Sequence, residues 1–129
     1  MYIETTILIK ILFAHWIADF ILQAEVWANN KSKSFKSLLK HTVTYSVTLT
    51  FYLMIMTVDF DLSKALLLLL ITFVCHTFTD YFTSKVVSKM FANKHYGEPI
   101  PNFGAFTVIG FDQLLHYIQL FLTYIYVYG

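Results

Sequence analysis

The chain has 129 residues and a net charge of +1, with 57% hydrophobic residues, 13% charged residues and a mean hydropathy of +0.61. Soluble domains carry roughly 25% charged residues, and a chain this short buries only part of its surface when it folds. These numbers favour a membrane protein with lipid as its solvent. The near-neutral charge argues against a nucleic-acid partner. All nine basic residues are lysine, so no bidentate arginine clamp for phosphate is present.

Four apolar stretches predict four helices, at residues 3–22, 41–58, 65–89 and 106–128. A helix needs roughly 20 residues to cross a bilayer, which is close to the length of each stretch. None of them alternates with the period of two that barrel strands require. The short connections place neighbouring helices antiparallel. The sequence therefore predicts an all-α fold, an integral membrane four-helix bundle in which residues 1–129 form a single transmembrane domain.

The lysines predict the orientation of this bundle, because cytoplasmic loops carry an excess of positive charge. Seven lysines flank the loops after the first and third helices, and two lie toward the other side. The first group is Lys31, Lys33, Lys36, Lys40, Lys85, Lys89 and Lys94, and the second is Lys10 and Lys64. We therefore expect a multi-pass protein of the inner (cytoplasmic) membrane with both termini outside.

Histidines and aspartates recur inside the apolar stretches at one spacing. Three pairs are separated by four residues and a lone histidine opens the second helix: His15/Asp19, His76/Asp80, Asp112/His116 and His41. Residues at i and i+4 share a helical face, so an imidazole and a carboxylate can bind one metal ion. All seven residues fall at a similar depth near the predicted cytoplasmic surface. Ionisable groups inside a membrane are costly and usually functional, so the pattern predicts a metal site.

The number of ligands exceeds what one tetrahedral ion needs. One to three divalent ions fit the inventory, and two ions bridged by an aspartate would use it well. Zinc is the leading candidate because it accepts imidazole and carboxylate ligands, and manganese, iron and nickel are alternatives. A buried polar network or a proton path is the competing interpretation of the same residues.

Three further residues are candidates for substrate binding. Gln23 follows Asp19 by four residues on the same face, and Gln113 adjoins Asp112. Lys31 could attract a phosphorylated substrate or an anionic headgroup. The simpler interpretations are interfacial polar residues for the two glutamines and positive-inside charge for the lysine.

Taken together, these motifs resemble a family of small bacterial and phage membrane proteins of unknown function. The resemblance rests on His15-x-x-x-Asp19-Phe20-x-Leu22-Gln23, Trp27, Lys31, His41, His76-x-x-x-Asp80 and Asp112-Gln113-x-x-His116, and covers nearly the whole chain. The pattern is also distantly similar to predicted membrane-bound metal-dependent hydrolases. A weaker similarity, to zinc-dependent phospholipase C and zinc nucleases, implies phosphoester chemistry.

The leading functional hypothesis is a metal-dependent hydrolase that acts on an ester, phosphoester or lipid-like substrate, with Asp112 as the general base. The alternatives are a non-catalytic interaction protein that a metal stabilises, and a metal or proton conduit. Structural and catalytic sites share ligand types, so enzyme activity is a hypothesis at this point.

Overall fold

In the computed structural model, the described residues 4–93 and 103–129 form helices and no strand, which confirms the predicted all-α class. Four helices are long: α1 (Thr5–Trp16), α3 (Phe35–Thr57), α4 (Leu62–Phe82) and α6 (Phe103–Tyr128). Two are short: α2 (Glu25–Asn30) and α5 (Ser88–Ala92). The four long helices correspond to the four predicted ones.

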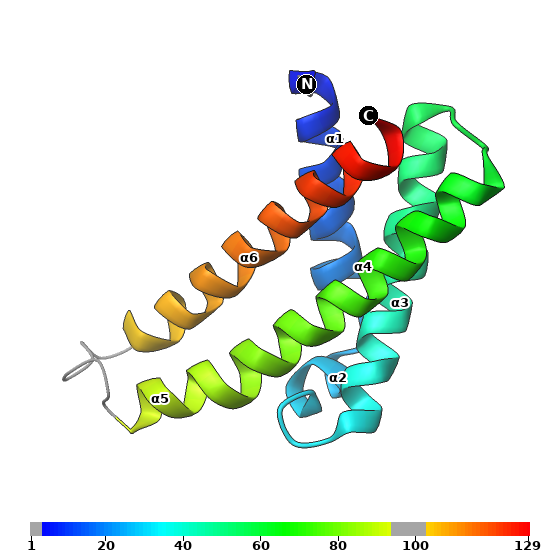
Figure 1. Cartoon of the computed structure of the whole chain (residues 1–129). Helices are drawn as coiled ribbons and strands as arrows, with labels where there is room; N and C mark the ends of the chain where they lie inside the picture. Colours follow the sequence, from blue (N-terminus) through cyan, green and yellow to red (C-terminus); the bar gives the residue numbers. More distant parts are fainter. Residues whose placement is uncertain (1–3, 94–102) are drawn as a thin grey trace.

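The long helices pack as a bundle with alternating directions. Both chain ends lie at one end of the molecule, and α2 and α5 lie at the other (Figure 1). Helix α4 packs on α3 and on α6, and α1 packs on α3 and on α6. Each long helix therefore runs antiparallel to the next one along the chain.

Two π-helical turns interrupt the predicted helices. Helix α1 continues into η1 (Ile17–Ile21), and α4 continues into η2 (Thr83–Val87). Such turns insert an extra residue into the helix and occur frequently at functional sites. Asp19 lies inside η1, and η2 begins three residues after Asp80. Both insertions therefore lie next to a predicted ligand, and periodicity alone did not predict them.

Helix α3 begins at Phe35, whereas the sequence predicted a start at His41. The Ser34 side chain caps it by accepting a hydrogen bond from the backbone N–H of Ser37 at 3.3 Å. The polar segment before His41 is thus partly helical, because a cap allows a helix to begin among polar residues. His41 therefore lies about 9 Å along the axis from the start of α3, inside the helix.

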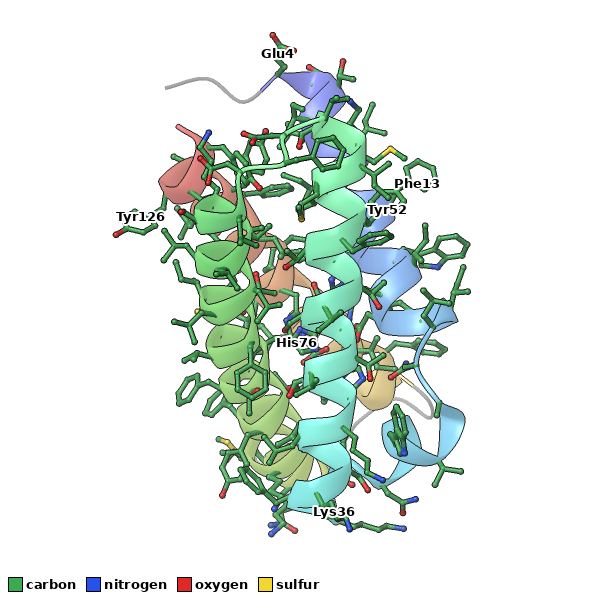
Figure 2. The ribbon with its side chains drawn as sticks, turned by 90° about the vertical axis from the view of Figure 1, so that its right-hand side faces the viewer. Glu4, Phe13, Lys36, Tyr52, His76 and Tyr126 are labelled. Atoms are coloured by element: carbon green, nitrogen blue, oxygen red, sulfur yellow. The ribbon has the colours of Figure 1, made fainter. Side chains whose placement is uncertain are left out.

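The predicted ligand His76 also lies inside the bundle. Figure 2 shows it between the two ends of the molecule, which Glu4 and Lys36 mark.

The apolar core lies between the site and the end that carries the termini. Its buried members are Ile11, Ala14, Ala18, Tyr45, Leu49, Leu53, Leu68 and Leu120. Large apolar side chains also cover the outer surface of every long helix, as Phe13, Phe51, Leu70 and Leu122 illustrate, each more than half exposed. Figure 2 shows Phe13 and Tyr126 pointing away from the bundle. The helices are therefore apolar on both their inner and outer faces.

Among the described residues, one helical stretch is long and apolar enough by itself to cross a membrane. It is Leu62–Met90, with 29 residues and a hydropathy of 1.7. A single stretch of this kind is a weak indication of membrane association. The multi-pass topology and its orientation stay predictions, and Lys94, which contributed to the orientation, lies outside the described residues.

The packing of α3 gives a direct test of the fold. We expect Leu49→Ala to lower the free energy of unfolding by about 2–5 kcal/mol, because it leaves a cavity in the core. Val47→Ala on the same helix is the control, since Val47 is half exposed and should change stability little. Thermal unfolding followed by circular dichroism would measure both. Equal effects of the two substitutions on the free energy of unfolding would contradict the packing of Leu49 in the core.

Candidate metal centre

Two imidazoles and two carboxylates meet in the middle of the bundle. The Nε2 atom of His41 lies 3.1 Å from Nε2 of His76, 3.2 Å from Oδ1 of Asp19 and 3.0 Å from Oδ2 of Asp80. The Nε2 atom of His76 lies 3.7 Å from that Asp19 oxygen and 3.6 Å from that Asp80 oxygen. All four side chains are buried, and they come from η1, α3 and α4. We call these four residues the first ligand group.

The spacing between each histidine nitrogen and its neighbouring ligand atoms suits the binding of a small ion. Zinc bonds to nitrogen and carboxylate oxygen are roughly 2.0–2.2 Å long, so the ligand atoms of a regular tetrahedron lie about 3.3–3.6 Å apart. Five of the six distances among the four atoms, all except that between the two carboxylate oxygens, range from 3.0 to 3.7 Å. Within this group Asp19, His41 and His76 offer ligand atoms that all lie within 4.8 Å of one another, so these three residues could hold one divalent ion; His76, Asp80 and His116 form a second such set.

Hydrogen bonding within the described chain leaves the same carboxylate atoms unsatisfied. Oδ1 of Asp19 and Oδ2 of Asp80 are buried and have no hydrogen-bond partner among the described residues. A buried carboxylate oxygen without a partner is strongly unfavourable, and a cation is an effective compensation. The two oxygens that converge on the histidines are thus the two carboxylate oxygens without a hydrogen bond, and His41, at 3.2 and 3.0 Å, pairs with them only when it is protonated. This coincidence is the strongest structural argument for a metal ion.

A second ligand group adjoins the first. The Nε2 atom of His116 lies 3.3 Å from Oδ1 of Asp80 and 3.5 Å from Oδ2 of Asp112. The ring of His116 stacks on that of His76 at a centroid distance of 4.1 Å. Asp80 faces both groups, with Oδ2 toward the first and Oδ1 toward the second. It occupies the bridging position that the sequence analysis gave to an aspartate.

Lys31 reaches into this cluster from the turn after α2. Its ammonium nitrogen lies 3.0 Å from Oδ1 of Asp80. Burial disfavours the charged ammonium, but Asp80, Asp19 and Asp112 outweigh that effect and raise the pKa of Lys31. Lys31 thus supplies one positive charge to the three carboxylates, and it competes with a second metal ion for the Asp80 oxygen.

His15 lies beside the ligand groups and not within them. Its Nδ1 atom is 2.6 Å from the hydroxyl of Tyr45, and its Nε2 atom is 2.7 Å from Oε1 of Gln113. The amide of Gln113 in turn donates to Oδ2 of Asp19 at 3.2 Å. In this arrangement His15 and Gln113 orient Asp19, so the predicted ligand role of His15 and the substrate role of Gln113 stay predictions.

Two residues outside the predicted site residues support the site. Tyr45 is buried and stacks on His76 at a centroid distance of 3.7 Å. Thr83 donates a hydrogen bond to Oδ1 of Asp112 at 2.5 Å. Tyr45 follows His41 by four residues, and that spacing indicates it.

The predicted substrate-binding residue Gln23 is half-buried, and its Oε1 atom has no hydrogen-bond partner in the described part of the chain.

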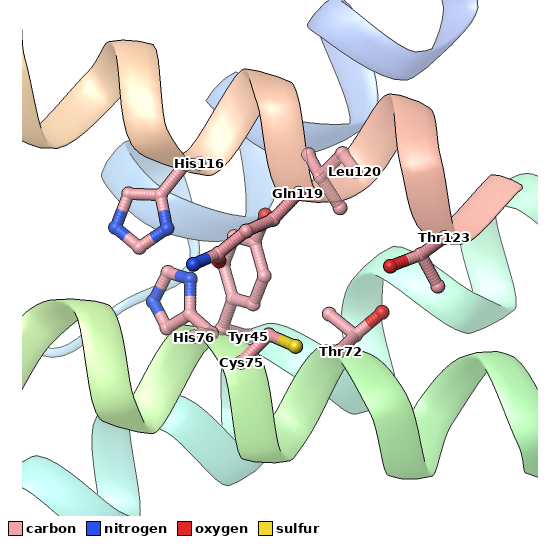
Figure 3. A pocket seen from close by; sticks show the side chains of 8 residues that line it. All are labelled: Tyr45, Thr72, Cys75, His76, His116, Gln119, Leu120 and Thr123. Carbon is pink, nitrogen blue, oxygen red and sulfur yellow. The ribbon is translucent and has the colours of Figure 1, made fainter.

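Cavities lie on two sides of the cluster. A cavity of about 10 Å³, enough for one water molecule, adjoins His76 and His116 on the side toward the termini. Figure 3 shows that Gln119, Thr72 and Thr123 line it as well. A larger and more open cavity of about 160 Å³ lies on the other side. Its walls include Lys31, Thr83, Ser84, Ser88, Val108, Ile109 and Asp112, and we call it the Lys31–Asp112 cavity.

Comparison with known proteins finds one family. The model of the family described as "Protein of unknown function (DUF3307)" matches residues 7–128. The chain belongs to this family. The match extends over all seven predicted metal ligands. No curated protein and no solved structure shows a significant similarity to the chain.

The first ligand group predicts that the purified protein contains a divalent metal. We expect about one equivalent or more in the wild type and a large loss in Asp80→Asn, because the substitution weakens a ligand of both groups. Asp59→Asn is the matched control, since Asp59 pairs with Lys64 in the turn between α3 and α4. Elemental mass spectrometry would measure the metal, and circular dichroism would verify folding. A folded, metal-free wild type that takes up no added zinc, manganese, iron or nickel would contradict the prediction.

Metal binding should also stabilise the fold, since the ligands come from three different elements. At a free metal concentration of 100 times the dissociation constant, the gain is about 2.7 kcal/mol. Chelation of the wild type should therefore lower its melting temperature, and chelation of Asp80→Asn should have a much smaller effect. Differential scanning calorimetry on both proteins would measure the change, and equal shifts would count against the site.

Proposed function

We propose that the protein is a membrane-embedded, metal-dependent hydrolase of an ester or phosphoester in an amphiphilic substrate. The observation that carries this proposal is the Lys31–Asp112 cavity. It brings a partly exposed cation, Lys31, and a nearly buried carboxylate, Asp112, to the edge of the ligand groups. A catalytic metal site requires access for the substrate, and this cavity supplies it.

The residues around the cavity suit distinct roles in hydrolysis. A divalent ion in the ligand groups would lower the pKa of water and so supply a nucleophile near neutral pH. Asp112, positioned by Thr83, would accept the proton of the attacking water as general base. The hydroxyl adds to the phosphorus or carbonyl carbon, and the bond to the alcohol oxygen breaks. That oxygen then takes the proton from Asp112. Lys31 would neutralise the charge of a phosphoryl group.

The distribution of apolar surface supports a membrane location. All four long helices carry large exposed apolar side chains, and soluble monomers rarely expose apolar surface on this scale. Six of the described lysines lie in or next to α2, α5 and the start of α3: Lys31, Lys33, Lys36, Lys40, Lys85 and Lys89. These elements meet at one end of the bundle (Figure 1). Such an end is suited to the cytoplasmic headgroup region.

One observation favours a second candidate function. The first ligand group contains four side chains of ligand type, and structural zinc sites are closed by four protein ligands. A metal that only clamps η1, α3 and α4 together would serve a non-catalytic interaction protein. The conduit hypothesis gains less support, because the apolar core lies between the site and the end with the termini. An activity measurement is therefore needed to distinguish a structural metal clamp from a hydrolase.

Asp112 provides the sharpest test of catalysis. We expect Asp112→Asn to lower kcat by about 10²–10⁴-fold, the typical contribution of a general base, while the first ligand group keeps its metal. Suitable probes are bis-(p-nitrophenyl) phosphate, p-nitrophenyl acetate and short-chain phospholipids, assayed with detergent-purified protein. Asp61→Asn is the matched control, because Asp61 caps α4 and asparagine is an equally good cap.

The outcomes separate the two candidates. Hydrolysis that requires metal and is lost in Asp112→Asn, while at least one equivalent of metal stays bound, supports the hydrolase. Activity that survives this substitution at the wild-type rate removes Asp112 from the mechanism. If the wild type binds metal, loses stability on chelation and hydrolyses none of the probes, the clamp is the better account.

A further inference from the structure

A groove on the outer surface, between α2 and the start of α3, has walls of two kinds. Its volume is about 410 Å³, and its lining is Trp27, Lys36, Leu39, Lys40, Val43 and Thr44. Lys36 and Lys40 are exposed and lie one turn apart on α3. The ammonium of Lys40 lies 5.5 Å from the ring centre of Trp27. One end of the groove is thus cationic and aromatic, and we call the whole feature the Trp27 groove.

The apolar wall of the Trp27 groove continues along the outside of α3. Val43, Val47 and Phe51 follow one another at intervals of four residues, and their exposed fractions are 48%, 50% and 65%. This stripe extends for about 12 Å along the helix, away from the lysines. A cationic end joined to a straight apolar stripe has the shape and polarity of a phospholipid footprint.

We propose that the Trp27 groove binds an anionic phospholipid. The phosphate lies against Lys36 and Lys40, the glycerol region lies against Trp27, and one acyl chain follows Val43, Val47 and Phe51. Tryptophan favours the headgroup level of a bilayer, and lysines near the surface attract anionic lipids. Two positive charges, with no acidic residue among the described side chains of the lining, favour an anionic over a zwitterionic headgroup. The proposal rests on the membrane location above but not on the metal or on catalysis.

Trp27 gives the groove its own spectroscopic reporter. The chain has two tryptophans, so Trp16→Phe leaves Trp27 as the single emitter. In detergent micelles, we expect phosphatidylglycerol with brominated acyl chains to quench Trp27 more strongly than brominated phosphatidylcholine. Native mass spectrometry should show phosphatidylglycerol retained in preference to phosphatidylcholine.

A double substitution tests the two lysines. Lys36→Gln/Lys40→Gln should weaken binding of phosphatidylglycerol by roughly tenfold or more, since each lysine contributes on the order of 1 kcal/mol. Lys33→Gln/Lys89→Gln is the matched control, because it removes the same charge from exposed lysines outside the groove. The control should retain the preference for phosphatidylglycerol. Both double variants are compared with the wild type by native mass spectrometry. Fluorescence is not used here, because Lys40→Gln also removes a contact of Trp27 and so changes the reporter itself.

Three results would overturn the proposal. Equal quenching and retention of the two lipids would show that the groove does not select the headgroup. Unchanged binding in Lys36→Gln/Lys40→Gln would remove the lysines from recognition. Displacement of the lipid by inorganic phosphate alone would identify a general anion site. All of these measurements are independent of metal content and hydrolysis, so failure here and failure of the proposed hydrolase are distinguishable.

Discussion

The burial of Asp19 and Asp80 is the constraint on which the rest of the structure depends. Two carboxylates inside a helical bundle are strongly unfavourable unless positive charge or hydrogen-bond donors compensate them. Around them lie His41, His76 and the ammonium of Lys31. Even so, one oxygen of each carboxylate has no hydrogen-bond partner in the described chain, and a divalent ion would satisfy both oxygens at once.

The helical irregularities follow from the same constraint. Residues at i and i+4 of a regular helix share a face, but three separate helices must aim their side chains at a common point. The π-helical turns η1 and η2 alter the direction of the backbone at and just after the two aspartates. The hydroxyl of Thr83, at the first position of η2, reaches Asp112 on α6. Local irregularity thus coincides with the predicted ligands, as is common at functional sites.

The two faces of the cluster differ in a way that bears on function. Toward the termini, the site meets a water-sized cavity and then a tightly packed apolar core. Toward α2 and α5 it meets the larger Lys31–Asp112 cavity. In the proposed hydrolase, a substrate would therefore approach from the lysine-rich end. The Trp27 groove lies at the start of α3, near the same end, so a bound anionic lipid would help to hold the mouth of the site at the membrane surface.

The sequence by itself determined the helical class, the four long helices and the identity of the ligand candidates, because hydrophobic period and i, i+4 spacing are local properties. Tertiary structure decided which candidates meet. It brought together Asp19, His41 and His76 in one set and His76, Asp80 and His116 in another, and it placed His15 in a hydrogen-bond network with Tyr45 and Gln113. It also brought Lys31 to Asp80, 49 residues away in the sequence. Spacing along one helix fixes which side chains share a face, but the contacts between helices depend on their packing and on the π-helical turns, which no local pattern encodes.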